Sequence, residues 1–213
     1  MQKEEILNSE EIEILQELMN IAFGQSAADL EDVIDTQVVL SVPFIKLLQV
    51  SELTDYFKNY VKDYKKINLV EQKFWGRFKG DALLVFSSGA GKELITLLKH
   101  DEEEVSLESD PVDILERETL MEVGNILVGA CVGKIAELLK DVVTYTPPMV
   151  AVEKEYQDAI SGDRYDPEST AIVLKTDFCF DERDVTGFLF LVTNKDSVTW
   201  LRESLKLFIE QYE

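Results

Sequence analysis

Two stretches of the chain carry apolar side chains at every third or fourth position, which is the spacing of one face of an α-helix. In residues 13–33 this pattern comprises Leu15, Leu18, Met19, Ala22, Ser26, Leu30 and Val33. In residues 118–138 it comprises Leu120, Val123, Leu127, Cys131, Ile135 and Leu138. Polar residues lie on the opposite side of both stretches. The sequence therefore predicts two long amphipathic helices, each with one face in a core.

Patterns typical of strands and short helices follow each long helix in a similar order. The first half contains a β-rich run over 37–48, a helical segment over 51–65, a hairpin of 66–78 and 81–87 with Gly80 at its turn, and a short helix near 91–99. The second half contains a β-rich run over 142–155, a polar loop over 156–170, a hairpin of 171–180 and 186–193, and a helix over 195–209. We expect Asn8 or Ser9 to cap the first long helix, and Asp113 with Glu116 to form a capping box on the second.

The two halves also share identical residues. Residues 13–43 align without a gap with residues 118–148, and the identical pairs are Glu13/Glu118, Leu15/Leu120, Glu17/Glu122, Asn20/Asn125, Ile21/Ile126, Gly24/Gly129, Val38/Val143 and Pro43/Pro148. We interpret this similarity as an internal duplication. Since one helix and three strands bury too little surface to fold alone, we expect a single domain over 1–213. Its repeats span about 8–100 and 112–210, joined by an acidic linker near 101–111.

The shared polar residues fall on the exposed side of the predicted helices. Glu13, Glu17, Asn20 and Gly24 form a first stripe, and Glu118, Glu122, Asn125 and Gly129 form a second stripe. Asn and Gly are each unfavourable inside a helix, by about 0.5–1 kcal/mol relative to Ala, and Gly leaves bare backbone that another molecule can approach. A lone Glu-x-x-Asn pair would be ordinary solvated surface. Its repetition, at a cost to helix stability, indicates a functional surface.

Composition narrows the classes of function. There are 42 acidic and 21 basic residues, giving a net charge of −21, and such a surface repels the phosphate backbone of nucleic acids. Cys131 and Cys179 are the only cysteines and His100 is the only histidine, so zinc sites and His-based triads are not expected. No signal peptide and no long uncharged apolar stretch are apparent, so a cytoplasmic protein without membrane insertion is expected.

The side chains of the two stripes fit one kind of chemistry. Neither Glu nor Asn is an activated nucleophile, and one copy offers too few carboxylates to hold a metal ion unaided. An Asn amide can orient a water molecule because it donates and accepts at once, and a Glu one turn away can contact a Lys on a partner. The stripes could therefore complete the active site of another protein. The alternative is a binding module or adaptor that docks a partner without catalysis.

At these residues the sequence resembles the CheC family of chemotaxis phosphatases, whose relatives include CheX and FliY. The family pattern is an acidic residue or Ser, then three residues, Glu, two residues, Asn, twenty-two residues and Pro. It occurs here twice, as Glu13, Glu17, Asn20 and Pro43 and as Glu118, Glu122, Asn125 and Pro148. Two full motifs resemble CheC more than the single-motif CheX, and the lack of an appended rotor-switch domain argues against FliY.

The resemblance implies an α+β fold with pseudo-twofold symmetry, in which one largely antiparallel sheet of about six strands carries two long helices on one face. It implies hydrolysis of the aspartyl-phosphate on a CheY-type receiver. By analogy, Asn20 and Asn125 align the attacking water, Glu17 and Glu122 pair with the receiver Lys, and Glu13, Gly24, Glu118 and Gly129 contact the partner. The receiver supplies Mg²⁺, so no cofactor is expected on this chain. CheD is a second partner of the family, although the polar loop over 156–170 replaces the short helix that binds it.

Overall fold

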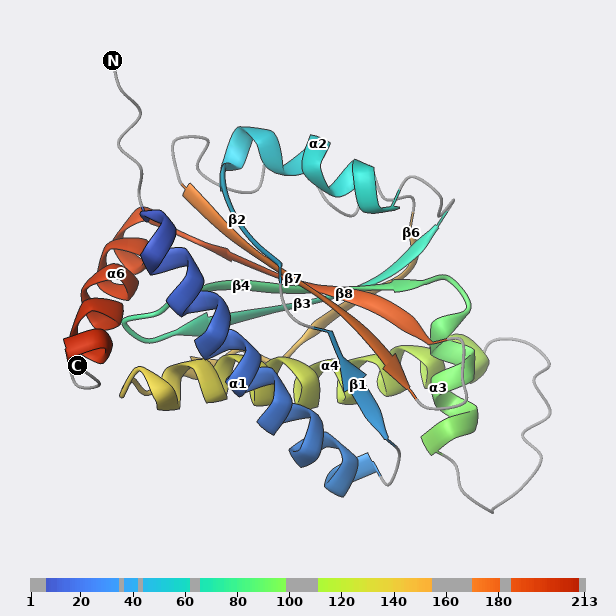
Figure 1. Ribbon diagram of the computed structural model, residues 1–213. Coiled ribbons are helices and arrows are strands. Elements are labelled where there is room, and N and C mark those ends of the chain that lie inside the picture. Colours follow the sequence, from blue (N-terminus) through green and yellow to red (C-terminus); the bar gives the residue numbers. More distant parts are fainter. Residues whose placement is uncertain are drawn as a thin grey trace.

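The computed structural model describes residues 7–34, 37–41, 44–61, 66–98, 111–154, 170–180 and 185–210. The helices are α1 (Ser9–Ile34), α2 (Val50–Val61), α3 (Ala90–Leu98), α4 (Pro111–Leu138) and α6 (Lys195–Glu210). The strands are β1 (Val38–Leu40), β2 (Phe44–Gln49), β3 (Ile67–Trp75), β4 (Gly80–Ser87), β5 (Thr144–Tyr145), β6 (Met149–Lys154), β7 (Thr170–Phe180) and β8 (Thr186–Thr193). The predicted α+β fold is confirmed (Figure 1).

The strands form one antiparallel sheet in the order β1-β7-β8-β4-β3-β5, with β2 also paired to β7 and β6 also paired to β3. The sheet has eight strands where about six were expected, because two short strands share each outer position. At the centre, β4 of the first half pairs with β8 of the second. At the edges, β3 pairs with β5 and β6, and β7 pairs with β1 and β2. Strands of both halves therefore interleave, while their origin by duplication stays a prediction.

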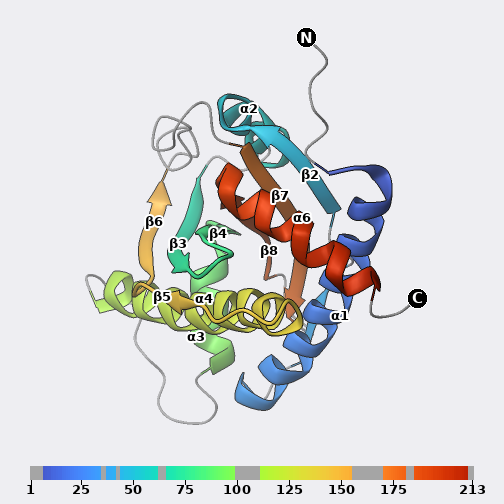
Figure 2. The same ribbon diagram turned by 90° about the vertical axis from the view of Figure 1, so that its left-hand side faces the viewer.

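Helices cover both faces of the sheet. One face packs under α1, α3, α4 and α6, and its core includes Leu15, Leu127, Phe86, Phe178 and Leu201. The other face packs under α2, with a smaller core around Phe57 and Phe190, whose ring centroids lie 4.4 Å apart. In Figure 2 the sheet lies between α2 and α4. Thus the two long helices do share one face, as expected. The opposite face is covered by α2, which contains residues 51–61 of the predicted helical segment over 51–65.

The long helix α4 also has the length and composition of a membrane span between Ile114 and Leu138. However, 56% of its most apolar window is buried inside the fold. Its buried side chains include Leu120, Val123 and Leu127, which belong to the core that α4 shares with α1. The apolar character of this helix is therefore explained by its central place in the core.

The starts of the two long helices differ from each other. Asn8 is the cap of α1: its Oδ1 accepts from the Glu11 backbone N–H at 2.8 Å, and its own N–H donates to Glu11 Oε2 at 2.9 Å. The prediction for Asp113 is wrong, because α4 begins at Pro111 and Asp113 lies within its first turn. Proline suits this first helical position, since its missing N–H would have no partner there. Glu116 instead turns inward and accepts from Asn68 Nδ2 at 3.1 Å.

The buried carboxylate of Glu11, in the first turn of α1, makes the stability of the fold depend on pH in the acidic range. Burial opposes its ionisation, but the Asn8 N–H and the Arg202 guanidinium, whose Nε lies 2.9 Å from Glu11 Oε1, lower the net pKa below the ordinary 4.5. A lowered pKa in the folded state means that the ionised carboxylate stabilises the fold above pH 4.5, and this stability is lost as the pH falls through the folded-state pKa. We expect Glu11→Gln to lower the free energy of unfolding by about 1–3 kcal/mol at pH 7 and by much less at pH 3.

Urea unfolding at both pH values measures this difference, with the exposed neighbour Glu10 changed to Gln as the control. Equal losses for Glu11→Gln at pH 7 and pH 3 would contradict the role of its charge.

Gly80 does not lie at a turn as predicted. It belongs to β4, where it pairs with Phe74 on one side and Thr193 on the other. A Cβ atom here would lie 2.2 Å from the Val192 carbonyl oxygen, so only glycine allows this close approach of β4 to β8. The last residue of the linker predicted near 101–111, Pro111, belongs to α4, and the rest of that linker lies outside the described residues. The polar loop up to residue 169, Pro43 and the turn over 181–184 also lie outside them.

Candidate functional site

Both predicted stripes lie on the outer side of the long helices. Glu13, Glu17, Asn20 and Gly24 are exposed on α1, while Glu118, Glu122 and Asn125 are exposed and Gly129 is half-buried on α4. On the opposite sides, Leu15, Leu18 and Met19 of α1 and Leu120, Val123 and Leu127 of α4 are buried. The helical period therefore placed these side chains correctly. The assignment of chemical roles to them stays a prediction.

The four stripe glutamates lie on the exposed outer sides of α1 and α4. Among the described residues, no Lys or Arg forms an ion pair with Glu13, Glu17, Glu118 or Glu122. Cations elsewhere on the molecule do find local partners: Lys134 pairs with Glu137 at 2.8 Å, and Arg202 with Glu11 at 2.9 Å. Each stripe thus offers two uncompensated negative charges beside a carboxamide, which is an arrangement suited to a cationic group of a partner.

A shallow depression of about 720 Å³ surrounds the second stripe. Its walls come from α4, β3, β5 and the segment that follows β5. The lining residues are Gln72, Glu118, Met121, Glu122, Asn125, Tyr145, Thr146, Pro147 and Pro148. No residue of α1 lines it, so the second stripe forms a local site separate from the first. Met121 is 38% exposed and, with the two prolines, gives this acidic depression an apolar rim.

Two polar side chains that line this depression, Gln72 and Tyr145, form hydrogen bonds with neighbouring groups of α4 and of the segment after β5. Gln72 of β3 donates from Nε2 to Asn125 Oδ1 at 2.8 Å and to the Thr146 carbonyl at 2.9 Å. The Tyr145 hydroxyl lies 3.5 Å from the Gly129 carbonyl, to which it donates. Burial, with a smaller contribution from Cys131, raises the pKa of Tyr145 to about 12, so its phenol keeps its proton at neutral pH. The exposed carboxamide of Asn125 is therefore hydrogen-bonded to the buried side chain of Gln72.

The described residues contain no group of three His, Cys, Asp or Glu side chains placed to hold a metal ion. Cys131 is buried in the core, as its helical position predicted, and burial raises the pKa of its thiol to about 12. A protonated, enclosed thiol is not a nucleophile. The polar groups that line the site are carboxylates, carboxamides, the hydroxyls of Tyr145 and Thr146, and backbone groups.

Gln72, Tyr145, Thr146 and Pro147 were not among the predicted site residues. The one available signal was the polar content of the strand INLVEQKFW, where Asn68, Glu71 and Gln72 interrupt an apolar run. All three are buried. Buried polar side chains in a strand mark places where a polar contact is made, but sequence alone does not say with which element.

Comparison with known proteins shows a similarity to one family over part of the chain. The model of the CheC-like family matches residues 115–151, which contain the second stripe. CheY-P phosphatase CheC of Bacillus subtilis is 28% identical over 134 residues, which make up 63% of this chain and 62% of that relative. The match thus spans under two thirds of the length of this curated relative. The chain is therefore similar to the CheC-like family over the segment that carries the second stripe.

Solved structures show the same fold. Thermotoga maritima FliY has a TM-score of 0.72 at 19% identity, covering 94% of this chain and 98% of that one. CheX of Borrelia burgdorferi, solved in complex with CheY, BeF₃ and Mg²⁺, has a TM-score of 0.53 at 16% identity, covering 81% and 96%. The FliM middle domain of H. pylori has a TM-score of 0.57 at 10% identity, covering 93% and 99%. Identities this low establish the fold and leave function to be argued from the site.

Proposed function

We propose that this chain is a phosphatase that removes the phosphoryl group from the aspartyl-phosphate of a CheY-type receiver. The carrying observation is the exposed Glu122–Asn125 pair in a depression whose floor orients the Asn carboxamide. The names of two relatives support this reading: one is a CheY-P phosphatase, and the other was solved together with CheY. The net charge of −21 disfavours nucleic acid as a partner, and we expect a cytoplasmic protein.

In the proposed reaction, Asn20 or Asn125 holds a water molecule in line with the phosphorus atom. The water oxygen forms a bond to phosphorus as the bond from phosphorus to the Asp oxygen breaks, so the products are the Asp carboxylate and inorganic phosphate. Glu17 and Glu122 pair with the receiver Lys, while Glu13 and Glu118 add negative charge to the contact. The receiver brings its own Mg²⁺. Catalysis then consists of positioning and electrostatics, with no covalent intermediate on this chain.

The test is the rate of phosphate release from a receiver charged with acetyl phosphate, with this chain added in substoichiometric amounts. Multiple turnovers above the intrinsic rate of the receiver support the proposal. Release at the intrinsic rate, together with measurable binding, would favour the alternative of a non-catalytic module or adaptor. That alternative is physically reasonable because the FliM middle domain has the same fold. A binding assay with CheD tests the second expected partner.

Gly24 and Gly129 offer a direct test of docking. A Cβ atom at either position meets nothing within 4 Å, and Ala is favoured over Gly in a helix by about 1 kcal/mol. We therefore expect Gly24→Ala and Gly129→Ala to raise the free energy of unfolding by about this amount each. If the bare backbone is the approach surface, the same changes raise KM for the phosphorylated receiver.

Urea unfolding and initial-rate kinetics on the same preparations separate the two effects. A gain in stability with an unchanged KM would show that the glycines are not part of the docking surface.

A further inference from the structure

Among the described residues that line the depression of the second stripe, Gln72 is the one that comes from the first half. It lies in the middle of β3 and is only 1% exposed. We propose that Gln72 is a positioning residue that sets the orientation of the Asn125 carboxamide, and that the first stripe has no such residue. This inference rests on the proposed function, because its consequence is a difference in catalytic rate between the two stripes.

The hydrogen bonds fix which way the two amides point. The Thr146 carbonyl can only accept, so the Gln72 atom 2.9 Å from it must be the amide nitrogen. The same nitrogen lies 2.8 Å from the side chain of Asn125. Since that nitrogen donates, the Asn125 atom facing it must be Oδ1. The Asn125 Nδ2 group is thereby turned away from Gln72, and Oδ1 keeps a second lone pair. The exposed carboxamide can still donate and accept, but its orientation is set.

Stability does not explain a glutamine at this position. Gln72 Oε1 is buried, and no described residue donates to it. A buried acceptor without a donor costs stability, and an apolar side chain of similar size would avoid that cost. What Gln72 provides, and an apolar residue would not, is the donor shared by Thr146 and Asn125.

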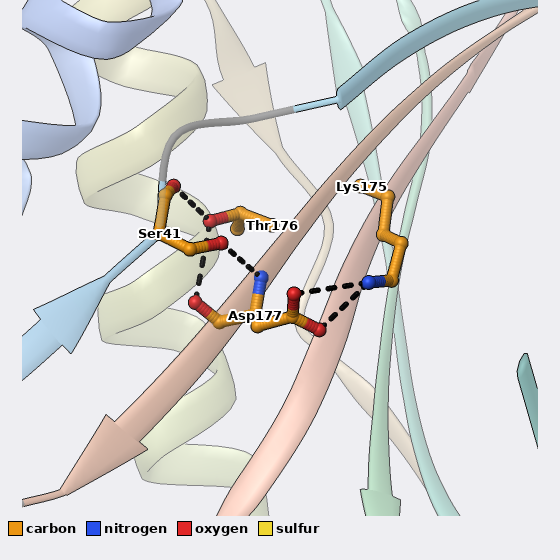
Figure 3. A network of polar contacts seen from close by, with 4 residues as sticks. All are labelled: Ser41, Lys175, Thr176 and Asp177. Atoms are coloured by element: carbon orange, nitrogen blue, oxygen red, sulfur yellow. Dashed lines mark hydrogen bonds and ion pairs between the residues drawn. The ribbon is translucent and has the colours of Figure 1, made fainter.

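Near the first stripe, Ser41 and β7 form the same pair of hydrogen bonds that Thr146 and β3 form near the second stripe, but no contact like that of Gln72 accompanies it in the described residues. Ser41 donates its N–H to the Asp177 carbonyl at 2.8 Å. Its Oγ accepts from the Asp177 N–H at 2.9 Å (Figure 3). Thr146 makes the corresponding pair with Lys73, at 3.0 and 3.1 Å. Ser41 is thus bonded to β7 by the same two hydrogen bonds that join Thr146 to β3.

The residues that precede Lys73 and Asp177 differ in the length of their side chains. Before Lys73 stands Gln72, and before Asp177 stands Thr176. Thr176 Oγ1 donates to the Ser41 carbonyl at 2.8 Å, as Gln72 Nε2 does to the Thr146 carbonyl (Figure 3). The threonine side chain ends there. In the described part of the chain, no hydrogen bond holds the Asn20 carboxamide, which lies on an exposed helix face. The two stripes therefore differ in preorganisation of the carboxamide.

The experiment changes Gln72 in two backgrounds, each of which lacks the asparagine of one stripe. In an Asn20→Ala background, where only the second stripe remains, we expect Gln72→Leu to lower kcat roughly tenfold while KM changes by less than about twofold. In an Asn125→Ala background, the same change should alter neither constant. The melting temperature should change little, because the removal of a buried unpaired acceptor offsets the loss of the hydrogen bond to the Thr146 carbonyl. Gln72→Glu keeps the shape but presents an acceptor to Oδ1, so it should lower kcat at least as much.

Two results would overturn the inference while leaving the proposed function standing. One is an unchanged kcat for Gln72→Leu in the Asn20→Ala background. The other is an equal loss of kcat in both backgrounds, which would indicate a merely structural role. Thr176→Val is the matched control and should leave kcat unchanged in the Asn20→Ala background. The NMR signals of the Asn125 side-chain NH₂ give a readout without activity. Gln72→Leu should shift them strongly and leave those of Asn20 in place. If the wild-type chain does not accelerate hydrolysis, the proposed function fails, and unshifted Asn125 signals would then refute the role of Gln72 separately.

Discussion

Replacing both Asn20 and Asn125 with Ala is expected to abolish the acceleration of receiver dephosphorylation. Removing one preorganised polar group from an active site typically costs about 10²–10³ in rate. Here both water-orienting groups would be lost, so phosphate release should return to the intrinsic rate of the receiver. Both side chains are exposed on helices, and Ala is the better helix former by about 0.5–0.7 kcal/mol per position. The fold should therefore survive, as judged by circular dichroism and urea unfolding.

The single variants Asn20→Ala and Asn125→Ala then show how much of the activity each stripe contributes. A chain in which only Asn125 works should retain more activity than one in which only Asn20 works, if the support from Gln72 matters as inferred. Gln25→Ala combined with Glu137→Ala is the control, since both residues are exposed on the long helices but point away from the stripes. Full activity in the double Asn variant would refute the site assignment, whatever the binding affinity.

Local patterns predicted the features that local physics controls. The period of 3.6 residues reports directly which side of a helix is buried, and Leu15, Leu18, Leu120 and Val123 are buried as this period requires. The same reasoning placed Asn20 and Asn125 outside. Strand positions came from apolar runs, and β7 and β8 occupy nearly the predicted ranges.

Features that depend on distant parts of the chain could not be obtained in this way. That β7 pairs with β1 and β2, and β3 with β5 and β6, follows from contacts between the halves rather than from any local signal. The hydrogen bond from Gln72 to Asn125 exists only because β3 of one half lies under α4 of the other. At the start of α4, the wrong prediction for Asp113 came from reading a capping pattern without the proline before it, which moves the first turn of the helix.

Phe178→Ala is expected to give the largest loss of stability among single changes in the core. Its side chain is 1% exposed, and its ring packs edge-on against Phe86, with centroids 5.1 Å apart, and against Phe180 at 6.2 Å. The absence of a side chain at Gly187 makes room for it, since a Cβ atom there would lie 2.3 Å from Phe178 Cζ. Removing a ring from so close a packing costs about 3–5 kcal/mol, a large share of the 5–15 kcal/mol typical of a folded domain.

Urea unfolding measures this loss, and Phe44→Ala is the matched control because its ring is 53% exposed and should contribute less than about 0.5 kcal/mol. A loss below about 1 kcal/mol for Phe178→Ala would mean that the sheet repacks around the gap. The ring belongs to the same core as the inner sides of α1 and α4 but is not part of either stripe. Activity should therefore fall only in proportion to the unfolded fraction, and kcat per folded molecule should remain unchanged. The two asparagine changes are expected to do the reverse, because they leave the core intact and remove the groups that face the partner.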